Sequence, residues 1–120
     1  MLDQVCVMTI RVKNLKESVH FYTEVLGFEL SQQYGESIVS LKHPNIPLIL
    51  EEHKDLDVQS QNNIVLAIKS ENLVEDIEQL KTNGVHFAFQ NPEPCPPGLY
   101  NVFKDPSGNQ IELIEFSKVR

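Results

Sequence analysis

The sequence predicts an α+β fold in which a βαβββ module occurs twice within 120 residues. Two runs rich in β-branched residues, at 5–12 and 63–69, are each followed by a helical pattern that begins after an asparagine and ends at a glycine. Corresponding positions in the two halves lie about 57 residues apart. Three short β-like runs follow each glycine. Any strand–helix–strand unit shares part of this pattern, so the repeat is inferred from order, spacing and closing glycine together.

In the first half, we expect a strand over 5–12 whose odd and even positions face opposite sides. Asn14 is suited to cap the next helix, with Glu17 three residues later as in a capping box, and Gly27 is suited to end it. The three strands that follow are expected near 28–34, 37–43 and 47–52. The predicted buried stripe of the helix consists of Leu15, Val19, Tyr22 and Leu26.

In the second half, we expect a strand over 63–69, a helix over 71–83, and strands near 85–89, 99–104 and 109–116. Residues 91–98 contain four prolines, which argue against helix and regular sheet pairing there. This segment is either a plain surface loop or a lid. The chain is thus predicted to be a single domain, 1–120, made of module 1 (1–53), a linker (54–62) and module 2 (63–120).

Composition excludes several classes of function. Ten Lys and Arg against seventeen Asp and Glu give a net charge of −7, which repels nucleic-acid phosphates and anionic lipid. No apolar run approaches the length of a membrane span, and the N-terminus lacks the basic start of a signal peptide. Cys6 and Cys95 do not form a CxxC motif, and two isolated cysteines give no disulfide framework. We therefore expect a cytoplasmic protein that binds neither nucleic acid nor membrane.

Glu112 is the most informative charged residue. It lies in an alternating run in which Ile114 and Phe116 share its face. A carboxylate beside two apolar side chains either points into a cavity or lies on a sheet whose second face is only partly buried.

Two segments resemble a known superfamily. The run 12–28, with Ser-x3-Tyr-x4-Gly-Phe, is similar to the opening of the glyoxalase/bleomycin-resistance/extradiol-dioxygenase group, the vicinal oxygen chelate superfamily. The run 103–113, with Asp-Pro-x-Gly-Asn-x-Ile-Glu-Leu, is similar to its closing strand. The resemblance implies a glyoxalase-like fold in which curved mixed sheets enclose a cleft with the helices outside, and a homodimer as the usual assembly.

In metal-dependent members of this superfamily, four side chains from the inner strands hold a divalent ion. By the resemblance, the positions fall on Val7, on Leu48 or Leu50, on Asn63 and on Glu112, so only Glu112 is a usual ligand. We therefore expect no cofactor. A divalent metal on a nonstandard site remains an alternative, with Glu51 and His53 as remote candidates.

The expected cleft is largely apolar with a few polar anchors, which suits a small-molecule ligand. Tyr100 and Phe103 are both candidates for the lining, and one of them is expected to face inward. The predicted lining residues are Val7, Thr9, Arg11, Asn63, Val65, Tyr100, Phe103, Glu112 and Ile114. Mutual or surface pairing is the alternative role for Arg11 and Glu112.

Three functions are compatible with these residues. The first is a metal-free protein that binds a drug or metabolite, in the manner of a resistance protein. The second is a lyase, isomerase or dioxygenase of the same superfamily that uses Glu112 as a general base or with a nonstandard metal site. The third is a protein interaction module.

Overall fold

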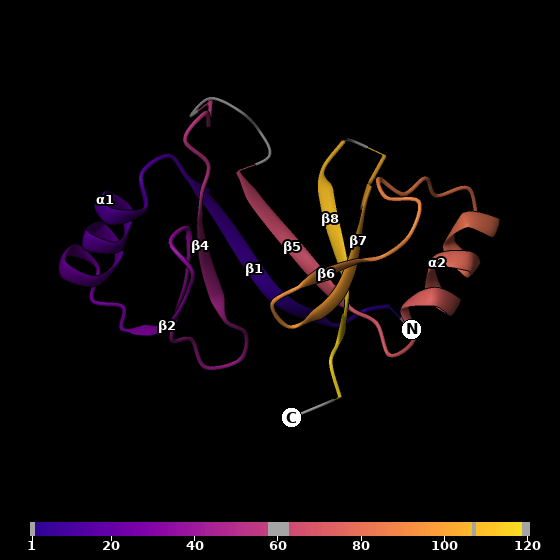
Figure 1. Ribbon diagram of the computed structural model, residues 1–120, viewed down its shortest axis with the longest axis horizontal. Coiled ribbons are helices and arrows are strands. Elements are labelled where there is room, and N and C mark those ends of the chain that lie inside the picture. Colours follow the sequence, from indigo (N-terminus) through magenta and orange to yellow (C-terminus); the bar gives the residue numbers. More distant parts are fainter. Residues whose placement is uncertain (1, 58–62, 107, 119–120) are drawn as a thin grey trace. The chain divides into compact units, whose positions relative to one another are not determined.

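The computed structural model describes residues 2–57, 63–106 and 108–118. Each half of the chain runs strand, helix and three further strands, so the predicted α+β fold with two βαβββ modules is confirmed (Figure 1). The chain divides into two compact units, Val7–Val65 and the combination of Met1–Cys6 with Leu66–Arg120. Residues 58–62 of the predicted linker lie outside the described residues. The described helices are all too short or too polar to cross a bilayer.

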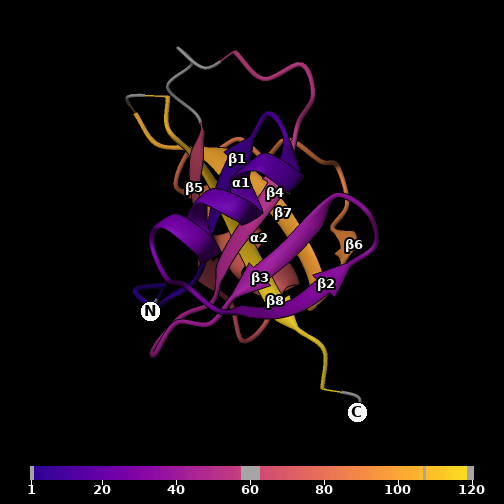
Figure 2. The same cartoon turned by 90° about the vertical axis from the view of Figure 1, so that its left-hand side faces the viewer.

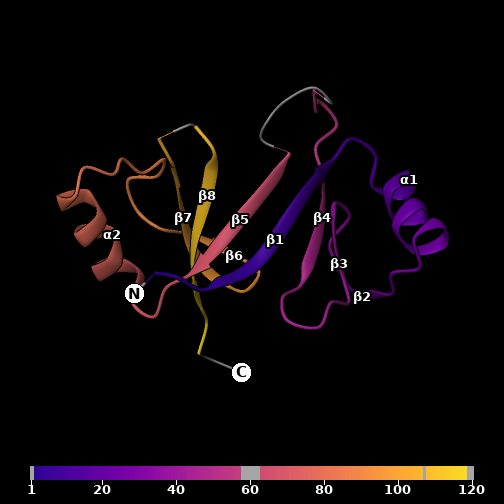
Figure 3. The same ribbon diagram turned by 180° about the vertical axis from the view of Figure 1, so that it is seen from behind.

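The Val7–Val65 unit contains a four-stranded mixed sheet in the order β2-β3-β4-β1 (Figures 2 and 3). Strands β1 and β4 pair in parallel, with Ile10 opposite Leu50, whereas β2–β3 and β3–β4 are antiparallel. The elements are β1 (Val5–Val12), α1 (Leu15–His20), η1 (Phe21–Val25), β2 (Leu30–Tyr34), β3 (Ile38–Leu41) and β4 (Leu48–Glu52).

One face of this sheet carries the core of the unit. Its buried residues are Val12, Leu15, Val39, Leu41 and Leu50. Ile10 and Leu48 pack on the same cluster, so the even positions of β1 and β4 lie beneath α1. Burying these side chains removes apolar surface from water and fixes which face of the sheet α1 covers.

The predicted start of the first helix is confirmed. The Asn14 side-chain oxygen accepts a hydrogen bond from the amide of Glu17 at 2.9 Å. The amide of Leu15, another donor that the first helical turn leaves without a helical partner, donates to the Glu52 carboxylate at 2.9 Å.

The predicted buried stripe of this helix is wrong at Leu26, which is 53% exposed. From Phe21 to Val25 the helix widens to a π turn, and the amide of Leu26 donates to the Phe21 carbonyl at 3.1 Å. A π turn advances each residue by a smaller angle than an α turn, so Leu26 lies off the stripe. Gly27 then takes a φ of 92°, and Phe28 packs on the core in place of Leu26.

The second half of the chain supplies the other four strands of one eight-stranded sheet, in the order β5-β8-β7-β6, with β5–β8 parallel and β8–β7 and β7–β6 antiparallel. Helix α2 packs on these strands through Leu73 and Ile77, which form a buried cluster with Leu113. The predicted helix end at Gly84 is confirmed, with a φ of 93°. The elements are β5 (Ile64–Lys69), α2 (Leu73–Thr82), β6 (Glu93–Cys95), β7 (Gly98–Lys104) and β8 (Gln110–Phe116).

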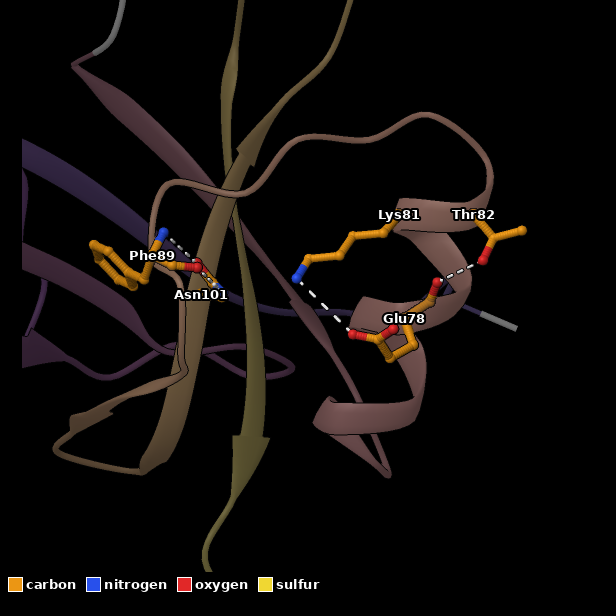
Figure 4. A network of polar contacts seen from close by, with 5 residues as sticks. All are labelled: Glu78, Lys81, Thr82, Phe89 and Asn101. Carbon is orange, nitrogen blue, oxygen red and sulfur yellow. Dashed lines mark hydrogen bonds and ion pairs between the residues drawn. The ribbon is translucent and has the colours of Figure 1, made fainter.

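The strand predicted at 85–89 is replaced by a single bridge between Phe87 and Phe103. The Asn101 side chain instead binds the Phe89 backbone on both sides, accepting from its amide and donating to its carbonyl, each at 3.0 Å (Figure 4). Asn101 is fully buried, so a side chain supplies the hydrogen bonds that a neighbouring strand would have supplied. In the same view, Lys81 and Glu78 pair along α2 at 3.9 Å.

The proline-rich segment was predicted to stay out of the sheet, and this is wrong for three residues. Glu93–Cys95 forms β6, in which Pro94 lies opposite Leu99 of β7. β6 is at the end of the strand order. A proline is tolerated there because an edge strand need not donate on its outer side.

Candidate functional site

In the Val7–Val65 unit, the face of the sheet opposite α1 carries five of the predicted lining residues. Val7, Thr9 and Arg11 are the odd positions of β1, and Thr9 lies opposite Ile49 of β4. Val7, Thr9 and Val65 are buried although α1 packs on the other face. We call this surface the helix-free face of the unit. It combines apolar side chains with a small number of polar groups, as small-molecule sites do.

Three polar side chains form a row across this face. Arg11 and Glu51 are register partners on the parallel strands β1 and β4, so their side chains leave the sheet on the same side. The Arg11 amide donates to the Asn63 carbonyl at 2.7 Å, which places Asn63 across from Arg11 on its other side. We call this set the Glu51–Arg11–Asn63 row.

The two ends of the row differ in their surroundings. At one end, the Glu51 carboxylate lies 3.1 Å from Nε2 of His53, and both side chains are partly exposed. At the other end, Oδ1 of Asn63 is buried and accepts no hydrogen bond from the described residues. A buried amide oxygen in this state costs about 1–3 kcal/mol relative to one that is hydrogen-bonded.

The position of Glu51 corrects the expectation for β4. Leu48 and Leu50, the predicted ligand positions, pack on the α1 side of the sheet. Ile49 and Glu51 take the helix-free face instead, because Thr9 and Arg11 are their register partners. Glu51 is therefore a face residue without any slip in register.

In the other unit, Glu112 and Ile114 of β8 share a face with Tyr100 of β7, which lies opposite Ile114. The Phe89 ring meets the Tyr100 ring edge to face at a centroid distance of 5.2 Å. Lys69 lies above the Phe116 ring at 5.9 Å from its centroid. Glu93 of β6 lies opposite Tyr100 and shares this face as well. The face therefore combines aromatic rings with the carboxylates of Glu93 and Glu112 and the ammonium group of Lys69.

Phe103 was predicted to line the cleft together with Tyr100, and the structure corrects this. The register places Phe103 opposite Ile111, one residue out of phase with Glu112. Its ring packs beside Phe87 on the cluster of Leu73, Ile77 and Leu113 beneath α2. Phe103 is a core residue of the unit.

Burial is the main influence on both thiols. It raises the pKa of Cys6, against lowering effects of the backbone hydrogen bond and of Lys69, and the Glu112 carboxylate adds the smallest effect, which raises the pKa. Burial likewise raises the pKa of Cys95, a hydrogen bond with the Gly98 backbone lowers it in part, and the Glu112 carboxylate makes the smallest contribution, which raises it. Both cysteines are free, and their raised pKa values keep them as thiols at neutral pH.

Sequence reasoning missed Ile49, Ser40 and Phe89 as face residues. Ile49 lies in the apolar run Leu48-Ile49-Leu50, which carries no alternation to tell the two faces apart. Ser40 lies opposite Ile49 on β3 and is buried. Its polar side chain between Val39 and Leu41 was the one available signal.

The side chains at the expected metal positions do not fit a divalent ion. Val7 has no donor atom, Leu48 and Leu50 face α1, and Asn63 offers an amide oxygen. Glu112 is the one carboxylate among these positions. Across the described ranges, no three His, Cys, Asp or Glu side chains gather in a set that could hold a metal. Divalent transition metals in proteins are held by sets of imidazole, thiolate and carboxylate groups.

Comparison with known proteins supports the fold. The chain is 29% identical over 112 residues to fosfomycin resistance protein FosX of Listeria monocytogenes, covering 88% of this chain and 84% of that protein. A variant of methylmalonyl-CoA epimerase from Streptomyces coelicolor, solved with 2-nitronate-propionyl-CoA, has a TM-score of 0.78 at 19% identity, covering 100% and 99% of the two chains. Hypothetical protein BH1468 of Bacillus halodurans has a TM-score of 0.75 at 19% identity, covering 98% and 96%.

The family model for the Glyoxalase/Bleomycin resistance protein/Dioxygenase superfamily matches residues 2–113. That range takes in both βαβββ modules and nearly all of the last strand. The chain therefore belongs to the Glyoxalase/Bleomycin resistance protein/Dioxygenase superfamily.

Proposed function

We propose that this protein binds a small organic molecule, a drug or a metabolite, without a metal ion. The observation that carries the proposal is the buried Oδ1 of Asn63, which lacks a partner among the described residues. A ligand that donates a hydrogen bond to this atom removes the cost of leaving it unsatisfied. Ile49, which is half-buried and pairs with Thr9 on the same face, provides apolar contact near this row.

Metal-independent binding is supported by the donor set. The position of Val7 carries a hydrocarbon side chain, and that of Asn63 a weak amide ligand. Replacing charged or imidazole ligands in this way weakens the site for a divalent ion by removing both bonds and charge. The scaffold is retained while three of four usual ligands are absent, which favours sequestration of a ligand over metal-assisted chemistry.

The relatives support a small-molecule ligand in general terms. One is named for resistance to fosfomycin, and another was solved with a CoA ester analogue. We extend to this chain only the class, a small organic molecule. We also propose that the protein is a cytoplasmic homodimer. Its mass in solution, measured by light scattering, tests whether it is a dimer.

A thermal-shift screen of drugs and metabolites tests the proposal. We expect a ligand to raise the melting temperature equally with and without a chelator, because binding to the native state alone stabilises it. Asn63→Leu should reduce the shift, whereas Asn45→Leu, at an exposed asparagine of the same unit, should leave it unchanged. A shift that requires added Mn²⁺, Co²⁺ or Zn²⁺ would contradict metal-independent binding.

The contact between Glu51 and His53 favours a second candidate, an enzyme that transfers a proton. A carboxylate 3.1 Å from an imidazole is a common acid–base arrangement, and Glu51 lies on the helix-free face. Glu112 is the corresponding candidate base of the other unit. Turnover of a ligand found in the screen, reduced at least about a hundredfold by Glu51→Gln or Glu112→Gln, would favour this candidate. Tight binding without turnover would favour the first.

A further inference from the structure

We infer that the Glu51–Arg11–Asn63 row recognises a neutral group that both donates and accepts hydrogen bonds, such as a carboxamide, lactam or urea, and that it discriminates against anions. This inference rests on the proposed function, because it names the chemical class of the ligand for the same face.

The row lies on three adjacent segments within one unit. Glu51 comes from β4, Arg11 from β1, and Asn63 from the residue that precedes β5. The Arg11–Glu51 register and the 2.7 Å bond between the Arg11 amide and the Asn63 carbonyl fix this order through the backbone. The relative placement of acceptor, donor and acceptor therefore depends on main-chain pairing, which is more rigid than a loop.

Asn63 sets the first requirement. Its buried Oδ1 can only accept, so the ligand atom next to it must carry a hydrogen. A fully ionised carboxylate or phosphonate has acceptors alone and would place a second oxygen against this one. An amide nitrogen meets the requirement.

Glu51 and Arg11 set the second requirement. Their charges are opposite and they are register partners, so the row carries no excess positive charge. The guanidinium has several N–H donors in a planar fork. These donors can bind the oxygen of a neutral carbonyl group. An anion bound at the row would be attracted by Arg11 and repelled by Glu51, its register partner. The net charge of −7 disfavours an anion further.

A second row of side chains, next to the Glu51–Arg11–Asn63 row, would contact the rest of such a ligand. Thr9 and Ile49 are register partners two residues along the strands, and Val65 is the next residue of β5 on the same side as Asn63. Val65 and Thr9 are buried, whereas Ile49 is half-buried and provides the hydrocarbon surface of this row. An aromatic or alkyl body attached to an amide group suits the two rows together.

Three probes that share a phenyl ring test the inference: benzamide, benzoate and phenylphosphonate. Each is titrated at neutral pH with a chelator present, and binding is followed by the amide NMR signals of Arg11, Glu51 and Asn63. We expect benzamide to bind at least roughly tenfold more tightly than either anion, the worth of one well-made hydrogen bond. Tighter binding of benzoate or phenylphosphonate would overturn the inference but leave the proposed function standing.

Asn63→Leu separates recognition from folding. Because this change removes a buried oxygen that lacks a partner among the described residues, the free variant should be at least as stable as the parent chain. It should nevertheless bind benzamide roughly tenfold more weakly and lose the preference over benzoate. Asn45→Leu is the matched control and should change neither property.

Three other outcomes are decisive. Unchanged benzamide binding in Asn63→Leu would overturn the inference, because the amide oxygen would then have no part in recognition. Binding of any probe only when the chelator is omitted would contradict the proposed function. Absence of binding by all three probes up to their solubility would count against both.

Discussion

The Glu115 carboxylate accepts a hydrogen bond of 2.6 Å from the backbone amide of Leu73, at the start of α2. The first module repeats this contact, with Glu52 accepting from Leu15 at 2.9 Å. In both modules the acid comes from the last strand and the amide from the first helical residue. The contact fastens each helix to the last strand of its own module and supports the internal repeat independently of the apolar pattern.

Glu115→Ala should lower the free energy of unfolding by about 1–2 kcal/mol, because it removes a charged acceptor from a helix N-terminus. Urea denaturation measures the change. Glu78→Ala is the control, since Glu78 is exposed and its pairing with Lys81 at 3.9 Å is worth little. Equal losses in the two variants would show that the Leu73 contact adds nothing to stability.

Gly27→Ala and Gly84→Ala should each destabilise the protein by about 1 kcal/mol. Both glycines have φ near +90°, and a Cβ at either position would meet nothing within 4 Å. The cost therefore comes from backbone conformation and not from a clash. Thermal unfolding checks both variants, and a neutral result would mean that the helix end relaxes to another conformation.

Asn101→Ala should cost more than either glycine change, about 2–4 kcal/mol, because it leaves both polar groups of the Phe89 backbone without the Asn101 partner. Hydrogen exchange at the Phe89 amide should quicken at the same time. Asn91→Ala, at an exposed asparagine in the same part of the chain, is the control. A small loss with unchanged exchange would mean that water replaces the side chain.

Glu112→Gln should lower the pKa of Cys95, since the negative carboxylate disfavours the thiolate. A lower pKa means more thiolate at neutral pH, so alkylation by iodoacetamide should accelerate by about twofold to fivefold. Mass spectrometry follows the reaction. Glu93→Gln, on the same strand as Cys95, should leave the rate unchanged. An unchanged rate in Glu112→Gln would place its charge too far from Cys95 to matter.

Features with a local cause were predictable from the sequence. Asn14 and Asn72 both cap helices through the amide three residues later, and Gly27 and Gly84 both end them with positive φ. Each depends on the residue type and its immediate neighbours. Module order and the strands with clear boundaries followed from the same signals.

The errors arose where distant residues decide the outcome. Residues 85–89 lack a regular ladder because the side chain of Asn101, distant in sequence, binds Phe89. Leu26 is exposed because the helix widens to a π turn before it. Glu51 reached the helix-free face because pairing with β1 sets the phase of β4, which its apolar run does not reveal.

The most direct test of the central claim is the metal content of protein purified without chelators, measured by elemental mass spectrometry. Metal-independent binding predicts far less than one divalent ion per chain, together with full binding of an amide ligand by that same preparation. One Mn²⁺, Fe²⁺, Co²⁺, Ni²⁺ or Zn²⁺ ion per chain, lost in Glu112→Ala along with ligand binding, would contradict it.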